Sequence, residues 1–116
     1  MGEGFISIQN TGTYERNMVH ITHSSGCDAH IPVTADMYGA FGCTLLIGGL
    51  GNKIISDSDT YYSFKKQNEA FINYLRTGEH PYPFSETIEL AKLVIGGIKS
   101  REEKGRKVLL SEIKER

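Results

Sequence analysis

The sequence predicts an α+β fold: a mostly antiparallel open sheet of about five or six strands, with two helices packed on one face. Up to about residue 60, short apolar or alternating runs are separated by turn residues, which is typical of strands. Beyond that point apolar residues recur every three or four positions, the spacing of amphipathic helices. A length of 116 residues suits one domain, so we expect residues 1–116 to form a single domain.

Three strands are expected in the first third of the chain. Phe5–Gln9 and Tyr14–Ser24 alternate apolar and polar residues, and residues 29–33 do so again after a turn at Ser25-Gly26. Pro32 has no N–H to give to a neighbouring strand, so the third strand is expected at an edge or at a strand end.

Further strands are expected on both sides of the helical region. The apolar run Cys43–Ile47 predicts a buried strand, and Gly48–Asn52 predicts a tight reversal into a strand at Lys53–Ser56. Thr34–Gly42 is expected to be a loop or a short helical turn. Lys107–Leu110 predicts a closing strand.

The first helix is expected to follow the last of the central strands. Asp59 or Ser63 can cap its start, it runs to about Arg76, and Gly78 supplies a left-handed stop. One side of this helix carries Phe64, Asn68, Phe71, Ile72 and Leu75.

The second helix is expected to be the more buried of the two. Ser85 is the expected cap, the helix runs from Glu86 to about Lys104, and Gly105 ends it. Each glycine of Gly96-Gly97 destabilises the helix by about 1 kcal/mol relative to alanine. Two glycines at this place therefore indicate that another backbone packs closely against the helix there. The expected apolar face consists of Ile88, Ala91, Val94, Ile95 and Ile98, widened by Leu90 and Leu93.

The composition narrows the possible partners and compartment. A net charge of −1 leaves no basic excess for nucleic acid or for an anionic membrane surface. The longest apolar runs, Cys43–Leu50 and Leu93–Ile98, are far shorter than the roughly 18 residues of a membrane span. Two cysteines, Cys27 and Cys43, do not suggest a disulfide framework, and the first residues lack signal-peptide features. We therefore expect a cytoplasmic protein.

The glycine-rich segments do not predict a nucleotide site. Gly48-Gly49-Leu50-Gly51 follows a strand, but the segment after it is expected to be another strand and not a helix. Gly2-x-Gly4 has no preceding strand. We therefore expect no cofactor-binding residue in this chain.

Potentially reactive side chains cluster at the second expected hairpin. His20, His23, Asp28 and His30 are the candidate substrate-side residues, with Cys27 beside them. A two-residue turn would place His23 opposite Asp28, whereas His20 and His23 would point to opposite faces of the sheet. That separation argues against a shared metal ion, so no metal site is expected. A cross-strand polar pair, an interface histidine and a histidine-dependent enzyme all remain open.

A sheet with helices on one face has a second face that the helices do not cover. Met18, His20 and Thr22 are expected on that second face. It can be a mixed polar surface, or it can meet a second copy of the chain in a two-fold interface.

A set of motifs follows in a fixed order along the second half of the chain. They are the glycine hairpin Gly48–Asn52, the aromatic helix and Arg-x-Gly of Phe71–Gly78, Pro81 and Pro83, Ser100, Gly105-Arg106 and Val108–Leu110. In these motifs the chain resembles the end of the Gfo/Idh/MocA family, the relatives of glucose–fructose oxidoreductase and inositol dehydrogenase. The resemblance covers about residues 43–113 well and residues 5–42 loosely.

This resemblance implies the C-terminal domain of an NAD(P)-dependent sugar or polyol oxidoreductase. Such a domain helps to form the substrate site and commonly packs against another subunit through its open sheet, so a homo-oligomer is expected. The family's glycine-rich nucleotide loop, Glu-Lys-Pro motif and Asp-x-x-x-His helix have no counterpart here, so no catalytic residue is carried over. The chain is therefore expected to be inactive without a Rossmann domain. A stand-alone binding or assembly module is the alternative.

Overall fold

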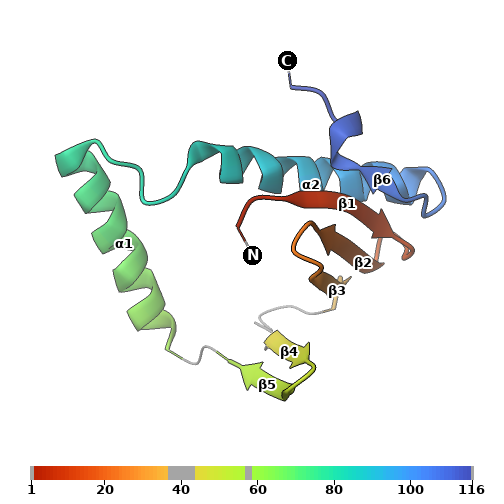
Figure 1. Cartoon of the computed structure of the whole chain (residues 1–116), viewed down its shortest axis with the longest axis horizontal. Helices are drawn as coiled ribbons and strands as arrows, with labels where there is room; N and C mark the ends of the chain where they lie inside the picture. The colour runs from red at the N-terminus through yellow and green to blue at the C-terminus, as the bar shows by residue number, and fades with distance from the viewer. Residues whose placement is uncertain (1, 37–43, 57–58, 116) are drawn as a thin grey trace. The chain divides into compact units, whose positions relative to one another are not determined.

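The computed structural model describes residues 2–36, 44–56 and 59–115. Within them, six strands, all in antiparallel pairs, and two α-helices confirm the α+β class (Figure 1). The chain divides into two compact units, one made of residues 1–38 and 82–116 and the other of residues 39–81. The single domain expected from the sequence stays a prediction.

The first unit contains a four-stranded antiparallel sheet in the order β3-β2-β1-β6 (Figure 1). Its strands are β1 (Phe5–Asn10), β2 (Arg16–His23), β3 (Asp28–Thr34) and the short β6 (Val108–Leu109). All four lie where the sequence predicts strands. The strand that carries Pro32, β3, lies at an edge of this sheet, as the missing N–H requires.

The hairpin between β2 and β3 has a different register from the predicted one. Thr22 pairs with Asp28, and the His23 amide donates to the Cys27 carbonyl at 3.1 Å. Gly26 has a φ of 83° and its amide donates back to His23, which is the geometry of a three-residue loop. Because the loop has one residue more than predicted, His23 and Asp28 are not partners.

One face of this sheet is covered by α2 (Phe84–Glu102), which runs alongside β1 (Figure 1). The predicted cap is wrong: Pro83 precedes the first turn, and Ser85 lies inside the helix. The helix also ends earlier than predicted, because Lys104 and Gly105 adopt left-handed conformations with φ of 62° and 80°.

The buried side of α2 consists mainly of small residues. Leu93, Gly96, Gly97 and Ser100 are buried, whereas most of the predicted apolar face, Val94, Ile95 and Ile98 included, is exposed. A Cβ atom on Gly96 would lie 2.7 Å from Ile8 Cγ2, so no larger residue fits there without a shift. The predicted close approach at the two glycines is therefore present, but the group that approaches is a side chain of β1 and not a backbone.

The core of the first unit is small and centred on the contact between α2 and β1. Its buried members are Ile8, Ile21, Leu93, Val108 and Leu110. Leu110 belongs to a 3-10 turn, Leu110–Glu112, that takes the place of the end of the predicted closing strand. The four described strands and one helix of this unit thus share one apolar cluster.

Ser100 connects three parts of the first unit through its side-chain oxygen. This oxygen accepts a hydrogen bond from the Asn10 amide at 2.9 Å and donates to the Arg106 carbonyl at 2.5 Å, and the side chain is fully buried. Gln9 adds a bond from Nε2 to the Gly105 carbonyl at 2.8 Å. Together these bonds attach the segment after α2 to the end of β1.

The second unit contains the hairpin β4 (Thr44–Gly48) and β5 (Gly51–Ile55), followed by α1 (Thr60–Thr77). The expected strands are present, but they form a separate two-stranded sheet, and the prediction of a buried strand is wrong because all residues of β4 are exposed. The predicted loop at residues 34–42 lies largely outside the described residues.

The ends of α1 match the sequence prediction. Asp59 accepts a hydrogen bond from the Tyr62 amide at 2.9 Å, and Gly78 stops the helix with a φ of 74°. No residue of α1 is buried, whereas α2 contains four buried residues, so α2 is the more buried helix as expected. Neither helix in the described part of the chain has the length and apolar character needed to cross a membrane.

Replacing Ser100 with alanine is expected to destabilise the protein by about 1–3 kcal/mol, because the buried Asn10 amide and Arg106 carbonyl both lose a partner. The measurement is urea unfolding followed by circular dichroism. The exposed Ser111→Ala is the control, with an expected change within about 0.5 kcal/mol. Equal effects of the two substitutions would contradict this role of Ser100.

Glu112 makes the stability of the protein depend on acid pH. The paired hydrogen bonds from Arg106, at 3.0 and 3.1 Å, and one from the Leu109 amide lower the pKa of Glu112 from its ordinary value of 4.5 to about 2. A lowered folded-state pKa adds stability that is present above pH 4.5 and is lost as the pH falls through about 2.

The difference in unfolding free energy between the native chain and Glu112→Gln is therefore expected to shrink as the pH falls from 4.5 to 2. Urea unfolding at several pH values measures this difference. Glu102→Gln, which removes the same charge, serves as the control. A difference for Glu112→Gln that stays constant across this pH range would refute the expected linkage.

Candidate functional site

The sheet face that points away from α2 brings three of the predicted candidate residues together. We call it the histidine face. His20 and His30 are directly opposite each other on β2 and β3, and their rings stack with centroids 4.4 Å apart and 9° between the planes. Asp28 Oδ1 lies 3.4 Å from His20 Nε2. Gln9 is opposite His20 on β1, so a row of polar side chains crosses three strands.

His20 and Asp28 lie close together without forming a hydrogen bond. The distance of 3.4 Å falls within the range of an ion pair, yet His20 Nε2 is shielded from solvent and has no hydrogen-bond partner. Asp28 keeps about half of its side-chain surface exposed. A shielded ring nitrogen without a partner is costly, so a small rotation of Asp28 that completes the hydrogen bond would be favourable.

His23 lies on the opposite face and has a structural role. It is buried, and its Nε2 donates to the Glu3 carbonyl at 3.0 Å, since a carbonyl can only accept. Nδ1 then accepts from the Ser25 amide and hydroxyl at 3.1 and 2.8 Å. The ring also meets the edge of Phe5. The prediction that His23 faces Asp28 is therefore wrong, whereas the separation of His20 and His23 onto two faces is confirmed.

The described residues do not assemble a metal centre. Among them no group of three or more histidine, cysteine, aspartate or glutamate side chains lies where it could hold a metal ion. The parallel stacking of His20 and His30 explains part of this, because stacked rings do not direct their nitrogens toward a shared point. Cys27 is an exposed thiol in the hairpin loop.

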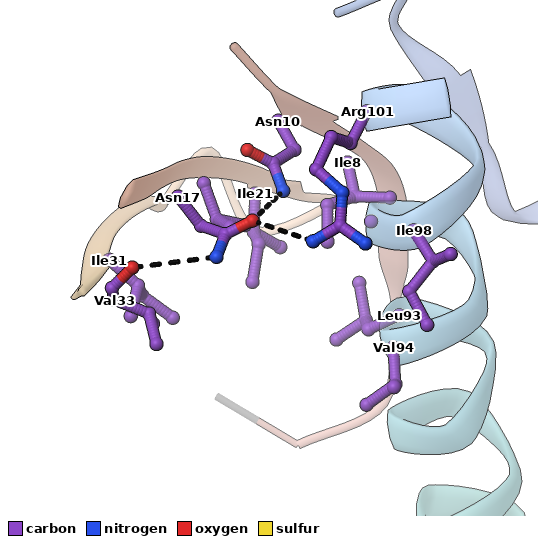
Figure 2. Close-up of a pocket in the computed structure, with 12 residues that line it drawn as sticks. Ile8, Asn10, Asn17, Ile21, Ile31, Val33, Leu93, Val94, Ile98 and Arg101 are labelled. Carbon is purple, nitrogen blue, oxygen red and sulfur yellow. Dashed lines mark hydrogen bonds between the residues drawn. The ribbon is translucent and has the colours of Figure 1, made fainter. Parts of the chain in front are cut away.

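The other face of the same sheet contains an apolar groove against α2, which we call the α2 groove (Figure 2). Ile8, Ile21 and Leu93 are the buried apolar side chains that line it. Val94 and Ile98 line it from α2, and its cavity volume is about 270 Å³. Two residues of β3, Ile31 and Val33, form the opposite side.

Three polar side chains converge at one end of the α2 groove (Figure 2). The Asn17 amide oxygen accepts hydrogen bonds from Asn10 Nδ2 at 2.9 Å and from Arg101 Nη1 at 3.0 Å. Asn17 Nδ2 donates to the Tyr14 and Val33 carbonyls, which determines the orientation of the amide group. The Arg101 guanidinium also lies 5.1 Å from the centre of the Tyr14 ring, within cation–π range.

Sequence reasoning did not identify this polar cluster. Arg101 belongs to a charged run at a helix end, which usually indicates a solvated surface. One signal was present in β2: Asn17 has the same parity as Val19 and Ile21, so it falls on the apolar face of that strand. A polar residue at such a position requires partners, and the structure supplies them.

Comparison of this chain with protein-family models, curated proteins and solved structures gives no match. Function is therefore inferred from the geometry of the two faces of the sheet and from the residues of the sequence itself.

Replacing His23 with alanine is expected to cost about 1–3 kcal/mol of stability, because the Glu3 carbonyl and the Ser25 groups lose a buried partner. His30→Ala, on the exposed strand of the histidine face, should change stability by no more than about 0.5 kcal/mol. Urea unfolding compares the two variants. A larger loss for His30→Ala than for His23→Ala would contradict the placement of the two residues.

Proposed function

We propose that this chain is the substrate-side and oligomerisation domain of an NAD(P)-dependent sugar or polyol oxidoreductase, and that it is inactive alone. The observation that carries the proposal is the position of the residues that resemble the Gfo/Idh/MocA family. Ser100 and Gly105-Arg106 lie at the junction that attaches the closing strand to β1. Residues of that motif thus connect the segment after α2 to the sheet of an α+β domain.

The histidine face supports a substrate-side role. Imidazole nitrogens, a carboxylate and an amide lie in adjacent positions on β1, β2 and β3, and all of these groups exchange hydrogen bonds with hydroxyls. Sugars and polyols are recognised through such bonds. In this proposal His20, Asp28 and His30 contact the substrate hydroxyls, whereas His23 does not take part.

Hydride transfer requires a nicotinamide nucleotide, which in this proposal a separate Rossmann domain binds. The glycine-rich segment Gly48–Gly51 joins the two strands β4 and β5, and so it lacks the strand-to-helix setting that cradles a pyrophosphate. We place the protein in the cytoplasm, because its low cysteine content gives no sign of an oxidising compartment.

A stand-alone assembly module that pairs through the histidine face is the second candidate. Met18, which lies on the same face as His20 and is paired with Pro32 on β3, keeps 49% of its surface exposed. Surfaces that combine apolar and polar side chains in this way are typical of interfaces between subunits that also exist apart in solution. Both candidates use the same face, and they differ in whether a nucleotide-binding partner is required.

Light scattering combined with calorimetry tests the proposal. The full chain is expected to be a homo-oligomer, Met18→Glu is expected to lower its mass to that of a monomer, and Ile95→Glu on the exposed side of α2 is the control. Titration with NAD(H) and NADP(H) should give no heat of binding. A chain that is strictly monomeric would remove the oligomerisation role, and micromolar nucleotide binding would remove the substrate-side assignment.

A further inference from the structure

We propose that the α2 groove binds a small aliphatic carboxylate, with the carboxylate on Arg101 and the apolar chain along the groove. This site is on the opposite face of the sheet from the histidine face. It also differs in chemistry, because a sugar hydroxyl would find few partners among its apolar side chains. The inference is therefore independent of the proposed function.

The walls of the groove favour an apolar tail. Ile8 and Leu93 are buried at its base, whereas Val94, Ile98, Ile31 and Val33 around its rim are 43–65% exposed. Covering such side chains with a hydrocarbon chain removes apolar surface from water, which is favourable in proportion to the area covered.

The size of the groove favours a single thin chain. Its volume of about 270 Å³ lies just below the range of about 300–1,000 Å³ that is usual for ligand pockets. A protein helix, with a diameter of about 10–12 Å including side chains, would lie across the rim without entering. An unbranched hydrocarbon chain can lie along the groove over Ile8, whose Cδ1 atom occupies the place next to Gly97, 3.3 Å from where a Cβ atom of that residue would be.

The polar end of the groove selects an anion. Arg101 is the charged residue among those that line the groove, and its hydrogen bond goes to the neutral amide of Asn17. Among the described residues no carboxylate forms an ion pair with Arg101. Its guanidinium is held in place by Asn17 and Tyr14, and it keeps further N–H groups that can form the paired bonds a carboxylate accepts.

These two features together determine the ligand class. An apolar molecule without a charge would leave the positive charge of Arg101 uncompensated, and a short anion without a tail would leave the rim exposed. A molecule with one carboxylate and one hydrocarbon chain satisfies both ends of the groove.

Isothermal titration of the full chain with octanoate, octanol and acetate tests this inference. Octanoate is expected to bind with one site per chain, and acetate is expected not to bind. Arg101→Gln should weaken octanoate binding by about tenfold and leave octanol binding unchanged, since only the charge-assisted bonds are lost. Arg76→Gln, which removes the same charge from the last turn of α1, is the matched control and should bind octanoate normally.

A second pair of variants tests the position of the chain. Val94→Trp is expected to fill the mouth of the groove and abolish the binding of octanoate, whereas Ile95→Trp, at the adjacent exposed position that does not line the groove, should leave it intact. Circular dichroism verifies that each variant is folded. If Arg101→Gln unfolds, Arg101→Lys replaces it, with partial loss expected because the charge stays and the paired bonds do not.

Three results would overturn the inference. The first is the absence of octanoate binding, and the second is equal binding by the native chain and the Arg101 and Val94 variants. The third is a fall in oligomer mass on Val94→Trp, which would identify the groove as a contact with another protein chain. None of these results affects the histidine face, whose role is tested separately by Met18→Glu.

Discussion

The contact between α2 and β1 exists because two consecutive helix positions have no side chain. Gly96 and Gly97 let the helix approach Ile8 so closely that a Cβ atom on Gly96 would overlap a methyl group. Ser100, one turn further along, is small enough to continue the approach and polar enough to satisfy the Asn10 amide that the helix covers. The remaining core forms around this line of contact.

The same contact explains why an apolar groove remains beside the helix. With the small residues of α2 directed at β1, its larger apolar residues Val94 and Ile98 are directed to the side of that contact. There they face Ile31 and Val33 of β3 across a gap that the helix does not fill. The helix thus packs closely on β1 and leaves the edge strand β3 incompletely covered.

The two faces of the sheet differ in chemistry because consecutive residues of β2 and β3 alternate between them. The three-residue loop at the β2–β3 hairpin determines which residues of β3 accompany His20 on its face. It places Asp28 and His30 beside His20 and leaves His23 on the other face, bonded to Glu3 and Ser25. A polar face and an apolar groove therefore occur on opposite sides of one small sheet.

The sequence by itself determined the features that depend on local backbone chemistry. The strands, the edge position that Pro32 requires, the Asp59 cap and the left-handed stop at Gly78 all follow from the conformational and hydrogen-bonding limits of single residues. Only the tertiary structure decided the hairpin register, the buried side of α2 and the polar cluster of Asn10, Asn17 and Arg101. Apolar periodicity assigns burial to the largest residues, whereas here the burial of α2 followed from how closely its backbone could approach Ile8. That distance is a property of two segments far apart in sequence, so no local pattern contains it.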